Sequence, residues 1–134
     1  MERHAGQLLV ALGIAHILVG IALWPGVLGD IGRGGVVGAV DPYQDRQAVF
    51  WFHMSGFLMI LLGQLAHWAQ ERTGTVPRFL GVGLLAFGLI GVALMPVSGF
   101  WAVLPIAALL MRASRAGTAR RVVAADPRSR VSGP

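Results

Sequence analysis

Two histidines inside otherwise apolar stretches are the residues of this chain that could do chemistry. His16 lies in the uncharged segment 5–24, and His53 lies in segment 50–70, whose sequence is FWFHMSGFLMILLGQLAHWAQ. An imidazole can bind a metal or haem iron, transfer protons or hydrogen-bond a polar ligand. Because an ionisable side chain is costly to place in an apolar environment, both residues are candidates for function.

The segments that carry them are long enough to cross a bilayer, since about 20 helical residues span about 30 Å. Of the 134 residues, 55% are hydrophobic and only 13% are charged, which is far from the composition of a soluble domain. We therefore predict an all-α, polytopic membrane protein with four transmembrane helices arranged as two hairpins. The predicted spans are 5–24, 47–69, 79–95 and 99–112.

Glycine, proline and charged residues mark the connections between these spans. We predict a flexible loop over residues 25–46, with 36–40 lying at the membrane interface or dipping inward. The linkers 73–77 and 96–99 are predicted turns, and Ser98 is a candidate helix N-cap. Residues 1–116 form the predicted transmembrane domain, and 117–134 a basic, disordered cytoplasmic tail.

Arginine placement predicts the orientation in the membrane. All eleven basic residues are arginines, and four spans would place nine of them on the side of both termini, leaving Arg33 and Arg46 on the other. The positive-inside rule then predicts cytoplasmic termini in a cell (inner) membrane. The tail is expected to contact anionic lipid headgroups, and nothing in the arginine pattern indicates nucleic acid binding.

Glycines recur at intervals of seven residues in three of the predicted spans. They are Gly6, Gly13 and Gly20, then Gly56 and Gly63, then Gly81 and Gly88. Such stripes let helix backbones approach closely. In addition, RHAGQLLVALG (3–13) matches RFLGVGLLAFG (78–88) in its arginine and two glycines, which suggests a parallel repeat of the two hairpins.

Three short motifs carry a family resemblance. FWF at 50–52, Val76-Pro77-Arg78 and, most specifically, MPVSGFW at 95–101 resemble small bacterial four-span membrane proteins grouped as a domain of unknown function. The resemblance covers about residues 3–112. The hairpin architecture is also loosely similar to DoxX-like membrane proteins. These resemblances imply a fold and a location, and no activity.

The two histidines are expected at nearly the same depth. His16 lies about 12 Å inside the outer boundary and His53 about 9 Å inside it, counted at 1.5 Å per residue. Both face the glycine stripes, so the imidazoles could approach each other. Three interpretations stay open: a structural role fixing helix register, a polar ligand or proton pocket, and metal or haem binding. Asp41 and Asp45 could add metal ligands only if the outer loop folds down.

Other polar or aromatic residues are candidates for the outer mouth of such a pocket. We name Trp51, Tyr43, Ser98 and Trp101 as candidate ligand-binding residues beside His16 and His53, which are the sole metal candidates. His67 is predicted to be an interfacial anchor. The chain has no cysteine, which excludes thiolate chemistry, and no Ser/His/Asp set lies within one leaflet.

The sequence therefore favours a non-enzymatic membrane component without a cofactor. It would bind a small lipophilic ligand or a partner subunit between spans one and two, and its glycine stripes make a homodimer plausible. The alternative is a small redox or transport module in which His16 and His53 handle haem, quinone or protons.

Overall fold

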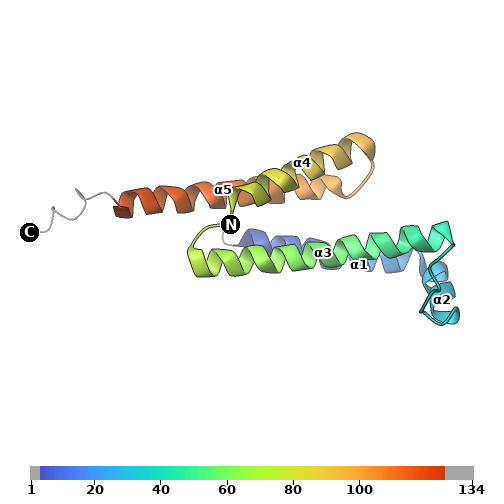
Figure 1. Cartoon of the computed structure of the whole chain (residues 1–134). Coiled ribbons are helices and arrows are strands. Elements are labelled where there is room, and N and C mark those ends of the chain that lie inside the picture. The colour runs from blue at the N-terminus through green and yellow to red at the C-terminus, as the bar shows by residue number, and fades with distance from the viewer. Residues whose placement is uncertain (1–3, 126–134) are drawn as a thin grey trace, which may run out of the picture. The chain divides into compact units, whose positions relative to one another are not determined.

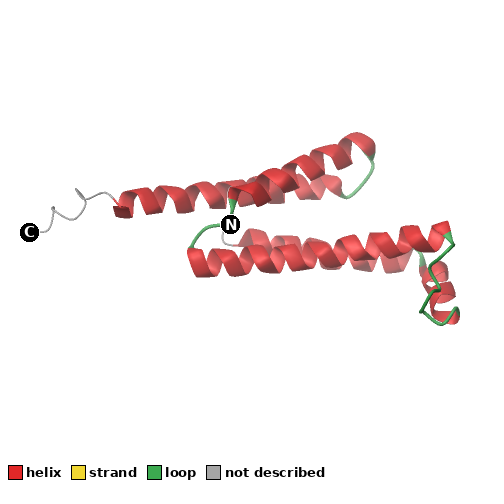
Figure 2. Cartoon of the chain, in the orientation of Figure 1, coloured by secondary structure: helices red, strands yellow, loops and turns green. Residues whose placement is uncertain are grey.

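The computed structural model describes residues 4–125, and this part of the chain consists of helices joined by turns and loops (Figures 1 and 2). The helices are α1 (Ala5–Leu23), α2 (Pro25–Arg33), α3 (Gln44–Thr73), α4 (Arg78–Leu94) and α5 (Phe100–Ala125). The predicted all-α class is confirmed for these residues. By length and composition, α1 and α3 could cross a membrane, and α4 is a shorter apolar helix.

The helix ends have reasons in the sequence. α3 ends at Thr73 because Gly74 adopts the left-handed conformation, with φ of 70°, that commonly follows a helix C-terminus. α4 begins directly after Pro77 and ends at Leu94, just before Pro96. Proline has no N–H to donate and disfavours helical geometry in the residue before it, so the chain must turn there.

The predicted loop over 25–46 is wrong in its first part, because Pro25–Arg33 forms α2. Pro25 occupies the first turn of α2, where a missing N–H costs nothing and the fixed φ of proline suits a helix. Pro25 lies beyond the end of α1 and starts the next helix after the single residue Trp24.

The predicted tail also needs correction. α5 continues through Pro105 and Gly117 as far as Ala125, so residues 117–125 are helical rather than disordered. Alanine and arginine are strong helix formers, and the next proline is Pro127. Residues 126–134, the remainder of the predicted tail, lie outside the described residues.

The chain divides into two compact units, residues 9–63 and residues 64–134 together with 1–8. In the first unit, α1 and α3 run side by side, and α2 lies across the end of the pair (Figure 1). In the second unit, α4 packs on α5 as a hairpin. Glycines of α4 face α5 in that hairpin: Gly81 lies against Met111, Gly88 against Leu104 and Gly91 against the ring of Phe100.

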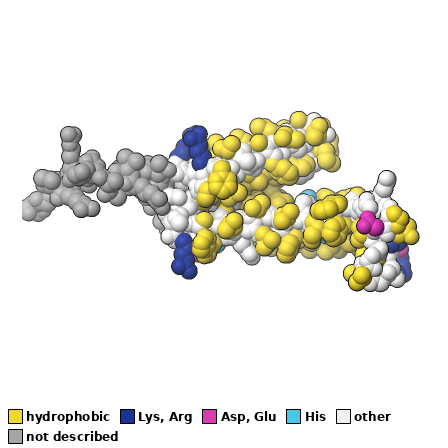
Figure 3. Space-filling view, viewed as in Figure 1, with side chains coloured by type: hydrophobic (Ala, Val, Ile, Leu, Met, Phe, Trp, Pro, Cys, Tyr) yellow, Lys and Arg dark blue, Asp and Glu magenta, His cyan; other side chains and the backbone are white. Residues whose placement is uncertain are grey.

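Large apolar side chains are exposed along the helices. On the face shown in Figure 3, hydrophobic side chains cover the helices of each unit, and charged side chains gather near helix ends. Leu18 on α1 is 60% exposed, and Phe79 and Leu94 on α4 are 75% and 77% exposed. Soluble monomers rarely expose continuous apolar surface on this scale.

The α4–α5 contact generates a stability prediction. A Cβ at position 81 would lie 2.9 Å from the backbone nitrogen of Met111, so Gly81→Ala must push α4 and α5 apart. We expect a loss of about 1–3 kcal/mol, as for other overpacked sites. Thermal unfolding in detergent, followed by circular dichroism, measures the loss.

The matched control is Gly83→Ala on the same helix, where a Cβ would meet no atom within 4 Å. Alanine is a better helix former than glycine by about 1 kcal/mol, so this variant should be at least as stable as the parent. Equal destabilisation of both variants would contradict the glycine contact.

Candidate functional site

The candidate site is the seam between α1 and α3, where two glycines bring the backbones together. A Cβ at Gly13 would lie 2.8 Å from the carbonyl oxygen of Gly56. Conversely, a Cβ at Gly56 would lie 2.7 Å from Cγ1 of Ile17 and 3.1 Å from Cδ2 of His16. The predicted role of these glycines in close helix packing is confirmed here.

His16 is tied from α1 to the backbone of α3. Its Nε2–H is shared between the carbonyl oxygen of Phe52 and Oγ of Ser55, each 3.2 Å away. The Ser55 hydroxyl donates in turn to the same Phe52 carbonyl at 2.7 Å, which fixes the serine oxygen as an acceptor for His16. The His16 ring also stacks on Phe52, with centroids 3.8 Å apart and planes 16° from parallel.

His53 uses its two ring nitrogens differently. Nδ1–H donates to the carbonyl oxygen of Val49, one turn earlier on α3, at 2.7 Å. Nε2 is buried and has no hydrogen-bond partner among the described residues. It lies over Gly20 of α1, where a Cβ would come within 2.8 Å of it. Because Nδ1 donates to a carbonyl of its own helix, Nε2 is the ring nitrogen that faces the seam.

The structure thus brings the two candidate histidines to one seam without a hydrogen bond between them. Each imidazole lies against a glycine of the opposite helix, His16 on Gly56 and His53 on Gly20. No group of three or more His, Cys, Asp or Glu side chains that could hold a metal occurs among the described residues. Neither Asp41 nor Asp45 therefore completes the metal site that we considered.

Tyr43 and Trp51 belong to the same unit but do not contact either imidazole through any hydrogen bond or ring pair. Trp51 is 67% exposed and stacks edge-on with Phe50. Tyr43 is exposed and lies under the guanidinium of Arg46, 4.2 Å from the ring centroid. Both side chains are available to surroundings outside the chain.

Ser98 and Trp101 lie in the other unit and share the turn between α4 and α5. The Ser98 hydroxyl donates to the Met95 carbonyl at 2.6 Å and accepts from the Phe100 N–H at 3.4 Å. The helix begins at Phe100, so Ser98 supports the preceding turn and is not the N-cap itself. The Trp101 indole donates to the Pro96 carbonyl at 2.9 Å. The Ser98 hydroxyl and the Trp101 indole thus stabilise the turn that the MPVSGFW motif itself forms.

His67 lies in a polar group near the ends of α1 and α3. The Gln7 amide oxygen is 2.8 Å from Nδ1 of His4, and the Gln7 amide nitrogen is 3.4 Å from Nε2 of His67. Glu71 lies 3.4 Å from the same His67 nitrogen. Gln7 of α1 therefore contacts a histidine of α3.

Sequence reasoning missed Ser55 and Phe52, the direct partners of His16. A signal for Ser55 exists, because it is the only hydroxyl side chain between Phe50 and Gln70. Phe52 acts through its backbone carbonyl and its ring face, and neither is visible in a residue pattern. The pairing of histidine with a carbonyl and a serine is the arrangement expected of a residue that fixes helix register.

The His16 contacts predict a graded loss of stability. His16→Ala removes the cross-helix hydrogen bonds and the stacked ring, and we expect it to cost about 2 kcal/mol. Ser55→Ala leaves the Phe52 carbonyl available to His16 and should cost about 0.6 kcal/mol. Unfolding in detergent measures both variants. A Ser55→Ala loss as large as that of His16→Ala would show that the Phe52 carbonyl does not hold the histidine.

The chain belongs to the family of unknown function DUF6463, whose family model matches residues 1–117. The match includes the whole α1–α3 seam and the α4–α5 turn. No curated protein and no solved structure matches the chain.

Proposed function

We propose that this DUF6463 protein is a four-span integral membrane component that acts by binding, as a subunit or a ligand carrier, and not by catalysis. The observation that carries the membrane part is the exposure of large apolar side chains along α1 and α4, described above. Lipid can take the place of the missing core around such helices. The DoxX-like architecture expected from the hairpins belongs to the same proposal.

Helix lengths support four spans. α1 and α3 pass the length and composition test for spanning a membrane. α4, with 17 residues, is about 26 Å long, so it would nearly match the hydrocarbon thickness. The apolar start of α5 is followed by Arg112 and Arg115, whose long side chains can reach the headgroups from just inside the bilayer.

Charge placement supports cytoplasmic termini in a bacterial inner membrane. Four spans collect nine arginines on the side of the termini, as counted above, and anionic headgroups would attract them. A partner membrane subunit or a second copy of this chain would bind through side chains that the seam leaves free. Trp51 and Tyr43, both exposed beside the α1–α3 pair, are the candidates.

The hydrogen bonding of the histidines supports a non-enzymatic role. Each imidazole donates an N–H to a backbone carbonyl of α3. His16 donates to Phe52, and His53 donates to Val49. The His16 bond joins α1 to α3 and is suited to fixing the helix pair, whereas the His53 bond lies within α3. The candidate ligand-binding residues are therefore those at the outer end of the α1–α3 pair.

One observation favours the alternative, a redox or transport module. The Nε2 atom of His53 is buried without a partner among the described residues, and buried polar atoms normally have one. Haem iron, a quinol hydroxyl or a transferred proton would each satisfy it. This nitrogen is the atom at which we expect the alternative to act.

Topology is tested by reporter fusions on the full chain. A fluorescent reporter fused at residue 134 should be active in the cytoplasm, and alkaline phosphatase inserted in the loop after residue 38 should be active outside. A phosphatase-active C-terminus would overturn the orientation, and reporter activity in the soluble fraction would overturn membrane insertion.

The alternative is tested on the purified protein by absorption spectroscopy and metal analysis. We expect neither a Soret band nor stoichiometric metal, because the histidines serve the helix pair. A Soret band or bound metal that is lost in His53→Ala and kept in Ser55→Ala would establish the cofactor version of the alternative instead.

A further inference from the structure

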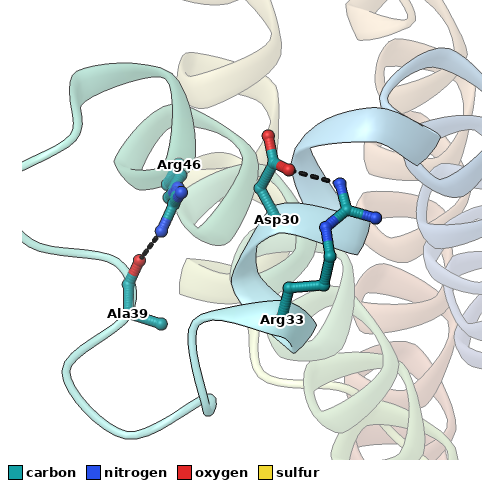
Figure 4. Close-up of polar contacts among 4 residues, drawn as sticks. All are labelled: Asp30, Arg33, Ala39 and Arg46. Carbon is teal, nitrogen blue, oxygen red and sulfur yellow. Dashed lines mark hydrogen bonds and ion pairs between the residues drawn. The ribbon is translucent and has the colours of Figure 1, made fainter.

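The segment between α1 and α3 forms a small structure of its own, here called the outer cap and defined as residues 24–43. It comprises α2 and the loop that follows it. Two hydrogen bonds hold it to the start of α3. Arg46 donates to the Ala39 carbonyl at 2.7 Å (Figure 4), and Gln47 donates to a carboxylate oxygen of Asp41 at 2.6 Å. These two hydrogen bonds therefore fix the cap at the end of the helix pair.

α2 has one apolar and one polar face. At about 100° per residue, Val27, Leu28 and Ile31 share one side of the helix. Asp30 and Arg33 lie on the opposite side and form an ion pair there (Figure 4). None of the residues of α2 is fully buried, so the apolar side chains are only half covered by the protein.

The position of α2 matches the boundary between hydrocarbon and water. It begins one residue after α1 and lies across the end of the α1–α3 pair (Figure 1). If α1 and α3 cross the bilayer, α2 lies along its surface. Trp24 and Tyr43, the aromatic types that favour this depth, stand at the two ends of the cap.

The loop after α2 carries further exposed apolar side chains. Val36 and Val37 are 66% and 93% exposed. Val36 has φ of 66°, a strained left-handed conformation that is rare for a β-branched residue. Glycine or asparagine would adopt it with less strain. An apolar side chain kept at a strained and exposed position suggests that its surroundings are apolar.

We infer that the outer cap binds the surface of the outer lipid leaflet, with α2 in the membrane plane and Val27, Leu28 and Ile31 on the acyl chains. This inference rests on the proposed membrane insertion of α1 and α3. Lipid is the occupant that the observations favour, because α2 begins two residues after Leu23, the 61% exposed last residue of α1, and carries only half-covered apolar side chains. Amphipathic helices with this division of faces bind at the headgroup boundary.

The test uses single-cysteine variants of the full chain, which has no cysteine of its own. Nitroxide labels at positions 31, 26 and 18 are compared in phosphatidylcholine vesicles by collision with oxygen, which concentrates in lipid, and with a water-soluble nickel complex. Gly26→Cys is the matched control on the polar side of α2, where a Cβ meets nothing within 4 Å. Leu18→Cys, on an exposed position of α1, reports membrane insertion itself.

We expect the oxygen-to-nickel collision ratio to be several-fold higher at positions 31 and 18 than at position 26. A ratio at position 31 as low as at position 26, with a high ratio at 18, would overturn the cap inference and leave membrane insertion standing. Exclusion of both reagents at position 31 would also overturn it, since protein would then cover the face. A low ratio at position 18 would overturn the proposed function itself.

Discussion

The close approach of α1 and α3 at Gly13 and Gly56 is the contact on which the rest of the first unit depends. With no side chain at either position, the two backbones come so close that a Cβ at Gly13 would lie 2.8 Å from the carbonyl oxygen of Gly56. Helices in lipid gain little from excluding apolar surface, so they rely on such contacts and on hydrogen bonds between them. The α1–α3 seam supplies both the close backbone contact and a hydrogen bond between the helices.

The histidines follow from that proximity. A helix pair held far apart could not place an imidazole of α1 within hydrogen-bond distance of a backbone carbonyl of α3, as His16 is with Phe52. The same proximity seats His53 over Gly20 and leaves its Nε2 facing a helix backbone. His16 thus fixes the register of the helix pair and His53 packs against Gly20, so any ligand would have to compete with that packing.

Much of the fold follows from sequence pattern, because apolar segments of helical length, prolines and glycines act locally. The four long helices and the glycine seams were predicted on this basis. α2 was missed because Pro25 and three glycines suggested a loop, although proline is well suited to a helix start. The end of α5 was missed because charge was taken as a sign of disorder, while its residues are good helix formers.

The site was harder to predict, since it depends on register between helices. Counting residues along the helices predicted nearly the same depth for His16 and His53. It could not show that His16 would hydrogen-bond a backbone carbonyl and Ser55 instead of His53. The matched segments 3–13 and 78–88 illustrate the same limit. Gly13 faces Gly56 and Ile60, whereas its counterpart Gly88 faces Val103 and Leu104, the counterparts of His53 and Met54. Similar helices therefore pack in different registers in the two hairpins.

The most direct test of the central claim is the placement of the histidine protons in lipid. Solid-state NMR of the full chain in bilayers, with nitrogen-labelled histidine and carbonyl-labelled phenylalanine, can measure the coupling between His16 Nε2 and the Phe52 carbonyl carbon. The structure predicts this coupling, together with a proton on Nδ1 of His53. Absence of the coupling, with a proton shared between the two imidazoles instead, would contradict the account.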